Sequence, residues 1–453
     1  MPTSAADQAP SIAGRAPTIG DLAGSRGWLV VAVMLLIVAA PLLRPGLPVT
    51  RAGFLPVAYI AGAVLPPALA FGAGEGLLLS AGRLAAPLLG TATVYKLLLA
   101  AALAIGAVGM TRVGRQVGGL AGGLLAAALF LFLPLLTAAL YLEGRVGWVW
   151  AWALWPWVLA LAARPRAGGP RLLAALVLAS LALALGVAGQ VDHLAPAELL
   201  MGRWPEGSTV ATWLSLRVHQ LGQGVLGLGL VSAWLAVAAR GSMRRGPLVT
   251  LTLAVGLALS ALVPRLPGLE LRLLLAALLL IRGAAALPAL APDFARAPWL
   301  AGTVALVALL GYPHLVPAFH DQVPTGVPRA FFGPDRLALV AATVEGALAP
   351  GSTVAVATTW QVTAPLDRDY TGFVHIVGAT SLIPVAQQDG LLLDGERPSS
   401  QWVVGELVSQ HYTIAIPADV SGGPYRVLTG LYRADTGVRL PRWPEGDSVE
   451  VAP

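Results

Sequence analysis

Long apolar runs with almost no charged residues fill the chain between residues 27 and 315, and they limit what it can fold into. Over the full sequence 57% of residues are hydrophobic and 11% are charged, whereas a soluble domain carries about 25% charged residues. A helix needs about 20 mostly apolar residues to cross the ~30 Å hydrocarbon core of a membrane. The sequence therefore predicts an integral membrane protein over this part.

The apolar runs give the expected helices. We expect membrane-spanning helices at 27–43, 94–111, 118–137, 147–163, 171–188, 222–239, 247–263, 271–289 and 299–315. Two weaker runs, 55–71 and 76–92, contain Pro66-Pro67 and Arg83 and predict a membrane hairpin, re-entrant helices or surface helices. The predicted fold of 27–315 is a polytopic α-helical membrane bundle of about 9 to 11 transmembrane helices.

The charges in the loops predict an orientation. Arginines gather in alternate loops, at Arg15 and Arg26, Arg112 and Arg115, Arg164, Arg166 and Arg171, and Arg240, Arg244 and Arg245. Basic loops face the cytoplasm, so residues 1–26 are expected as a disordered cytoplasmic N-terminus of a plasma (inner) membrane protein. The C-terminal part is then extracytoplasmic. Because the arginines are scattered rather than gathered on one face, nucleic acid is not expected as a partner, and membrane lipid is.

After a linker at 316–329 the pattern alternates apolar and polar residues with a period of two. The segments 337–344, 353–362, 370–377, 407–416 and 425–432 are rich in Val, Thr, Tyr and Ile. Turn residues such as Ser421-Gly422-Gly423-Pro424 separate them. This spacing is typical of an antiparallel sandwich. We therefore expect an all-β, immunoglobulin-like sandwich at 330–453, which packing alone must hold together because the chain has no cysteine.

Polar side chains on the predicted outer face are the candidates for a site. They lie in the loop with Arg44 and Arg51, in the run Tyr141-Leu-Glu143-Gly-Arg145 before a tryptophan-rich helix, and in the loop 189–221 with Asp192-His193. Simpler interpretations stand beside these. Tryptophans near a helix end are typical of an interfacial belt, and Lys96, at the outer start of a helix, is typical of a snorkelling lysine. No phosphate loop, nucleophile elbow or metal motif is found.

Three segments carry a resemblance to a known superfamily. Leu43-Arg-Pro-Gly-Leu-Pro-Val-Thr50, Val94-Tyr-Lys96 and the Glu143 run resemble GT-C glycosyltransferases, near the bacterial proteins labelled 6-pyruvoyl-tetrahydropterin synthase-related and the dolichyl-phosphate-mannose-transferase-like relatives. Trp360 to His375 and Ser400 to Glu406 resemble the β-sandwich appended to some of these transferases. The resemblance implies a polyprenyl-phosphate-linked sugar as donor and a glycan or protein acceptor in the cell envelope.

The resemblance also implies roles for individual residues. Glu75, Glu143 or Asp192 would accept the proton of the acceptor hydroxyl, and Arg51, Lys96 and Arg145 would contact the lipid phosphate. The superfamily usually places an Asp in the first outer loop, but Val49 to Gly53 contains no acid. Two interpretations of the resemblance therefore stay open: an active glycosyltransferase, and a catalytically degenerate member that acts as a scaffold or glycan-binding envelope subunit. A transporter or a purely structural envelope protein is the third alternative.

Overall fold

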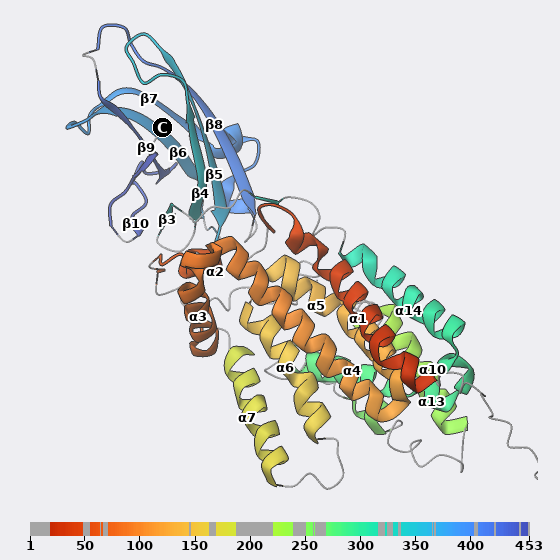
Figure 1. The fold of residues 1–453 in the computed structure, drawn as a ribbon. Helices are drawn as coiled ribbons and strands as arrows, with labels where there is room; N and C mark the ends of the chain where they lie inside the picture. Colours follow the sequence, from red (N-terminus) through yellow and green to blue (C-terminus); the bar gives the residue numbers. More distant parts are fainter. Residues whose placement is uncertain are drawn as a thin grey trace, which may run out of the picture.

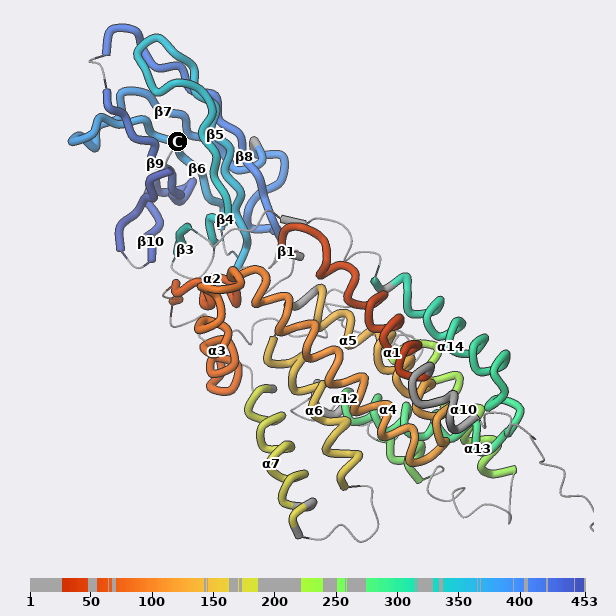
Figure 2. Tube along the Cα trace, in the orientation of Figure 1, coloured from red at the N-terminus to blue at the C-terminus, as the bar shows by residue number. Residues whose placement is uncertain are grey.

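The computed structural model shows an elongated group of helices with a set of strands at one end (Figure 1). It describes residues 19–48, 55–63, 65–66, 71–144, 146–162, 169–186, 221–238, 251–256, 258, 269–315, 322–323, 329–333, 337–364, 366, 368–402, 406–420, 423–443 and 445–451. We call residues 19–315 the helical domain and residues 329–451 the β-domain. The tube in Figure 2 shows α1 and α14, which are far apart in the chain, on the same side of the helical domain.

The helices form close to where the apolar runs predict them. Their bounds are α1 Ile19–Leu43, α2 Leu55–Ile60, α3 Ala73–Leu89, α4 Thr91–Leu131, α5 Pro134–Ala138, the π-helical turn η2 Ala139–Glu143, α6 Val146–Ala162, α7 Gly169–Gly186, α10 Gln223–Ala238, α12 Leu269–Ala284, α13 Leu287–Leu290, the 3-10 turns η4 Pro292–Ala295 and η5 Tyr312–His314, and α14 Ala297–Gly311. Helix α1 begins at Ile19, inside the segment expected to be disordered. The run 247–263 lies mostly outside the described residues.

Helix α4 is a hairpin of two antiparallel arms. The backbone leaves the helical region at Gly118 and Gly119, and Gly119 has a φ of +67°, which favours glycine. The second arm then packs back on the first, so that a Cβ built on Gly114 would lie 2.3 Å from the carbonyl oxygen of Gly122. The expected loop at Arg112 and Arg115 is therefore helix, and the chain reverses after it.

The prediction of a polytopic bundle with about 9 to 11 transmembrane helices is wrong. Within the part of the chain that the structure describes, one helix, Thr91–Leu131, is long and apolar enough to cross a membrane. The other apolar helices have apolar lengths of 10–17 residues, which at ~1.5 Å per residue is short of the ~30 Å of hydrocarbon. The apolar runs mark helices correctly, but prolines, glycines and turns interrupt them. The long first arm of α4, from Thr91 to the turn at Gly118, supports association with a membrane, and the exposed leucines of α1, α3, α7 and α14 fit that environment.

The tryptophans of α6 lie between helices rather than in a belt. The indole of Trp150 donates to the carbonyl of Leu98 at 3.0 Å, and the indole of Trp157 donates to the carbonyl of Ile105 at 3.0 Å. The two hydrogen bonds lie one heptad apart on both helices, from Trp150 to Trp157 on α6 and from Leu98 to Ile105 on α4. Helix α6 therefore runs along the first arm of α4 in a constant register. Arg112 adds a cation–π contact, with its guanidinium carbon 4.3 Å from the Trp157 ring centroid.

The β-domain consists of two antiparallel sheets. One has the order β10-β3-β4-β5-β8, with bounds Arg442–Trp443, Ala330–Phe332, Leu337–Glu345, Thr353–Val362 and Leu407–Ala415. The other has the order β11-β9-β6-β7, with bounds Val449–Val451, Tyr425–Arg433, Tyr370–Gly378 and Pro384–Leu391. The five long predicted strands are confirmed. Strand β7 is missed because its sequence, PVAQQDGL, is largely polar and half-exposed at a sheet edge.

The two sheets enclose one hydrophobic core. Trp360 is fully buried in it, and its ring meets Phe332 edge-on with centroids 5.4 Å apart. Trp402 and Tyr425 belong to the same core, as their aromatic character predicts. Tyr432 does not, because it lies on the outer face of its sheet. A β-rich C-terminal domain is therefore confirmed, and its packing accounts for stability without disulfides.

The two domains are joined by backbone pairing and by apolar contact. Strand β1 (Leu47–Pro48) follows α1 and pairs antiparallel with β2 (Gln322–Val323), which lies in the predicted linker. Phe331, Ala338 and Val340 of the β-domain belong to the hydrophobic cluster of the helical domain. The end of α1 and the start of the β-domain are consequently held at the same end of the molecule (Figure 1).

The α4 hairpin gives the first prediction. Gly114→Leu should destabilise the protein by about 1–3 kcal/mol or prevent folding, because the new side chain collides with backbone. Gly227→Leu in α10 is the matched control, since a Cβ there has no heavy atom within 4 Å. Thermal unfolding of the purified protein in detergent should show a lower midpoint for Gly114→Leu only, and equal midpoints for the two variants would contradict the hairpin.

Candidate functional site

Glu75 is the one predicted acid whose side chain the structure describes, and it joins helices. It is buried in the first turn of α3, and its Oε1 accepts a hydrogen bond of 2.9 Å from the backbone N–H of Gly147. Gly147 is in the first turn of α6. The N-terminal ends of both helices are electropositive, so a carboxylate there is stabilised. This geometry favours a structural role for Glu75.

The surroundings of Glu75 leave little space. A Cβ on Gly147 would lie 2.6 Å from the carbonyl oxygen of Leu185 and 2.9 Å from the Cβ of Glu75, so the end of α7 closes over this junction. Figure 2 shows the ends of α3 and α7 meeting. A base for an acceptor hydroxyl needs room for that hydroxyl beside the carboxylate, and the contacts here are those of packed helices.

Lys96 lies in the first turns of α4 and binds backbone. Its Nζ donates to the carbonyl oxygen of Arg44 at 2.5 Å, which holds the end of α1 against the start of α4. Of the residues expected to contact a lipid phosphate, Lys96 therefore contacts the backbone of Arg44. The ammonium group is already engaged by a carbonyl, at an exposed position.

The other predicted site residues can be placed only in part. Arg51, Arg145 and Asp192 lie outside the described residues. Glu143 ends η2, where its backbone is described and its side chain is not. Of the predicted site residues, the structure therefore brings Glu75 to Gly147, which follows Glu143 closely in the chain.

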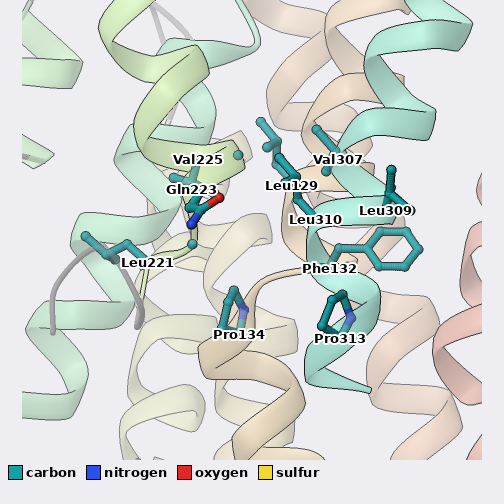
Figure 3. Close-up of a pocket in the computed structure, with 13 residues that line it drawn as sticks. Leu129, Phe132, Pro134, Leu221, Gln223, Val225, Val307, Leu309, Leu310 and Pro313 are labelled. Atoms are coloured by element: carbon teal, nitrogen blue, oxygen red, sulfur yellow. The ribbon is translucent and has the colours of Figure 1, made fainter. Parts of the chain in front are cut away.

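A cavity of about 420 Å³ lies at the beginning of α10 (Figure 3). Its walls come from the end of α4, the beginning of α10 and the end of α14, with Leu129, Phe132, Gln223, Val307, Leu310 and Pro313 among the lining residues. Figure 3 shows the Gln223 amide as the polar group among these apolar side chains. The first N–H groups of an α-helix have no partner within the helix, so the residues Gly222 to Val225 bring backbone donors to this wall.

An apolar groove of about 880 Å³ runs between α1 and α14. Leu29, Val33 and Ile37 of α1 form one wall, and Leu300, Val304 and Ala308 of α14 form the other. The groove and the cavity share Phe132 and Leu309, so the two spaces adjoin. An apolar groove and the polar beginning of a helix thus lie next to each other.

Gln223 and Phe132 are not among the site residues that the sequence predicts. The signal for Gln223 was present, because Gly222-Gln223-Gly224 places one amide at the start of an otherwise apolar helix. Nothing local marks Phe132, whose position follows from the packing of Gly311 against it. Among the residues with described positions, no group of three or more His, Cys, Asp or Glu side chains could hold a metal ion.

The cap at Glu75 gives the second prediction. Glu75→Ala should lower the free energy of unfolding by about 1–3 kcal/mol, because it removes the buried acceptor of the Gly147 N–H. Glu75→Gln keeps an amide oxygen at this position and should cost less. Thermal unfolding of both variants measures this, and a Glu75→Ala protein as stable as the wild type would contradict the cap.

Comparison with known proteins returns no match: no protein-family model, no curated protein and no solved structure is similar to this chain. The GT-C resemblance therefore stays a prediction, and the function has to be argued from the geometry of the cavity and the groove.

Proposed function

We propose that this chain is a membrane-associated protein that binds a polyprenyl phosphate or its sugar-linked form. The observation that carries the proposal is that the apolar groove between α1 and α14 and the cavity at the beginning of α10 share Phe132 and Leu309 in their walls. The hydrocarbon chain would occupy the groove, and the phosphate would occupy the cavity.

The groove suits a branched hydrocarbon chain. Its lining is apolar apart from the tyrosine hydroxyl of Tyr312, and it opens on the surface of α1 and α14, where Leu36 and Leu306 are exposed. Apolar surface left in contact with water is unfavourable, whereas contact with a lipid chain removes that cost. Sites of several hundred Å³ with mostly apolar walls are typical of small-molecule binding.

The cavity suits an anionic headgroup. The N-terminal end of α10 carries a positive partial charge, and Gln223 adds an amide that can donate to a phosphate oxygen. The described lining contains no carboxylate that would repel the phosphate. Helix end, amide and apolar groove together fit a lipid phosphate better than a free sugar.

Between the two open interpretations, binding without turnover is favoured. The lining described for the cavity has no carboxylate to act as a base, and Glu75 is engaged with Gly147. Sugar transfer is the second candidate, because the segment with Asp192 runs in sequence directly into Leu221 of the cavity wall. Loss of envelope glycosylation in Asp192→Asn, with lipid binding intact, would favour transfer.

We also propose that the β-domain faces away from the cytoplasm in an inner membrane. Arg112 and Arg115 lie beside the turn of the α4 hairpin, whereas the opposite end of its first arm lies near the β-domain (Figure 1). Basic residues favour the cytoplasmic side. The β-domain would then meet a glycan or protein partner in the cell envelope.

The phosphate part of the site gives the third prediction. Gln223→Glu should weaken binding of a polyprenyl phosphate by about tenfold or more, because a carboxylate of the same shape repels the phosphate. The helix should remain stable, since an acid is favourable in a first turn. Binding of the uncharged polyprenol should not change, and equal loss for both lipids would place the phosphate elsewhere.

The hydrocarbon part gives the fourth prediction. Ala305→Trp fills the groove, which Ala305 lines, and should weaken polyprenol and polyprenyl phosphate alike by about tenfold. Leu306→Trp is the matched control, because Leu306 is exposed on α14 and is absent from the groove lining. Native mass spectrometry of both variants measures bound lipid. Full binding by Ala305→Trp would exclude the groove.

A further inference from the structure

The outer face of the sheet β11-β9-β6-β7 carries a polar and aromatic cluster that the lipid site does not use. Register places Phe373 of β6 between Asp389 of β7 and Gly430 of β9, and it places Thr371 opposite Tyr432. The alternate residues of β6, Val374 and Ile376 among them, point into the core. Successive side chains of a strand point to opposite faces, so Phe373 and His375 of β6 and Tyr432 of β9 lie on the outer face of the sheet.

The segment between β9 and β11 folds over this face through Arg439. The guanidinium carbon of Arg439 lies 4.6 Å from the Phe373 ring centroid. Its Nη1 lies 3.2 Å from Oδ2 of Asp447, and its Nη2 lies 3.5 Å from Nδ1 of His375. Stacking and ion pairing fix the guanidinium group in one orientation.

The carboxylate of Asp389 is fixed from two sides. The hydroxyl of Tyr432 donates to Oδ2 at 3.3 Å, and Nε2 of His375 lies 3.5 Å from Oδ1. His375 is buried, with 11% of its side chain exposed, whereas the side chains of Asp389, Arg439 and Asp447 are 33%, 41% and 49% exposed. A buried imidazole thus positions charged groups that remain accessible, which is the arrangement of a preorganised binding site.

The chemistry of the cluster indicates its ligand. Carboxylates accept hydrogen bonds from hydroxyls, the guanidinium donates to ring and hydroxyl oxygens, and the half-buried Tyr432 ring offers an apolar face. Charges of both signs alternate across it, so a strongly charged ligand meets as much repulsion as attraction. We propose that Asp389, Tyr432 and Arg439 bind a neutral glycan on the outer face of the β-domain. The proposal is independent of the lipid site.

His375 gives this site a pH dependence. In the neutral ring that fits the contacts, Nε2–H donates to Asp389 and Nδ1 accepts from Arg439. Burial lowers the His375 pKa from its ordinary 6.5, Asp389 and Asp447 raise it, and Arg439 lowers it, with a net lowering. Protonation of His375 at Nδ1 gives the ring a positive charge and directs an N–H at the Arg439 guanidinium, so Nδ1 can no longer accept from Arg439. The arrangement is therefore complete above pH 6.5 and is lost as pH falls through the lowered pKa.

The full-length protein in detergent should be tested against an array of neutral oligosaccharides (cello-, malto- and manno-oligosaccharides), an anionic oligogalacturonate and a mixed peptide set. We expect at least one neutral glycan to bind and Asp389→Ala to weaken it about tenfold. Ser409→Ala is the control, because its hydroxyl pairs with Thr359 on the other sheet. Tyr432→Phe keeps the ring and removes the hydroxyl, and it should weaken glycan binding about threefold. This second variant tests the site even if Asp389→Ala does not fold.

Two comparisons decide the outcome. The proposal is overturned if no neutral glycan binds, if only oligogalacturonate or peptide binds, or if Asp389→Ala and Tyr432→Phe bind as well as Ser409→Ala. In the second comparison, His375→Gln should make binding independent of pH between about 5 and 7, since an amide donates and accepts without titrating there. A wild-type pH profile identical to that of His375→Gln would overturn the positioning role of His375.

Discussion

The two arms of α4 approach so closely that their backbones touch at Gly114 and Gly122, and the helical domain is arranged around this pair. Helices α1, α3, α6, α12, α13 and α14 all contact α4. Small residues allow helices to approach when hydrocarbon surroundings offer no hydrophobic drive to associate. The indole donors of Trp150 and Trp157 then fix α6 along the first arm. The positions of α10 and α14, and hence the cavity, depend on this arrangement.

Around the α4 hairpin, the apolar groove and the polar groups of the cavity occupy separate places. The groove between α1 and α14 exposes hydrocarbon side chains, and the adjoining cavity places Gln223 and a helix beginning at its polar end. A lipid phosphate has the same division between chain and headgroup. Glu75, by contrast, uses its charge at the junction of α3 and α6. The chemistry expected of that acid therefore has to come from elsewhere if the protein transfers a sugar.

The β-domain is stabilised by a core of its own, and its surface is more polar than that of the helical domain. Its core is closed by large side chains such as Trp360 and Phe332, so the outer face of the four-stranded sheet is free to carry polar groups. There the buried His375 joins Asp389 and Arg439, which lie on separate segments. Pairing of β1 with β2 holds this domain at the end of the molecule where α1 finishes.

Local sequence determined where helices and strands form. Apolar runs marked α6, α7, α10 and α14, because such runs leave water when a helix packs or enters a membrane, and alternation with β-branched residues marked β5, β6 and β9, because it records which face of a strand is buried. The absence of cysteine fixed how the β-domain must be held together. The position of each turn, however, was not determined locally: the turn expected at Arg112 and Arg115 lies at Gly118-Gly119, which looked like the start of the next apolar run.

Only tertiary structure decided the role of each polar side chain. Glu75 looked like a free carboxylate until the fold brought it to the N–H of Gly147, 72 positions away in the chain. Gln223 and Phe132 came to line one cavity because Gly224 of α10 packs against Leu129 of α4, and His375 met Arg439 because a segment after β9 folds back. Periodicity reports burial along one element, whereas a site is made by contacts between elements, and no spacing in the sequence encodes those.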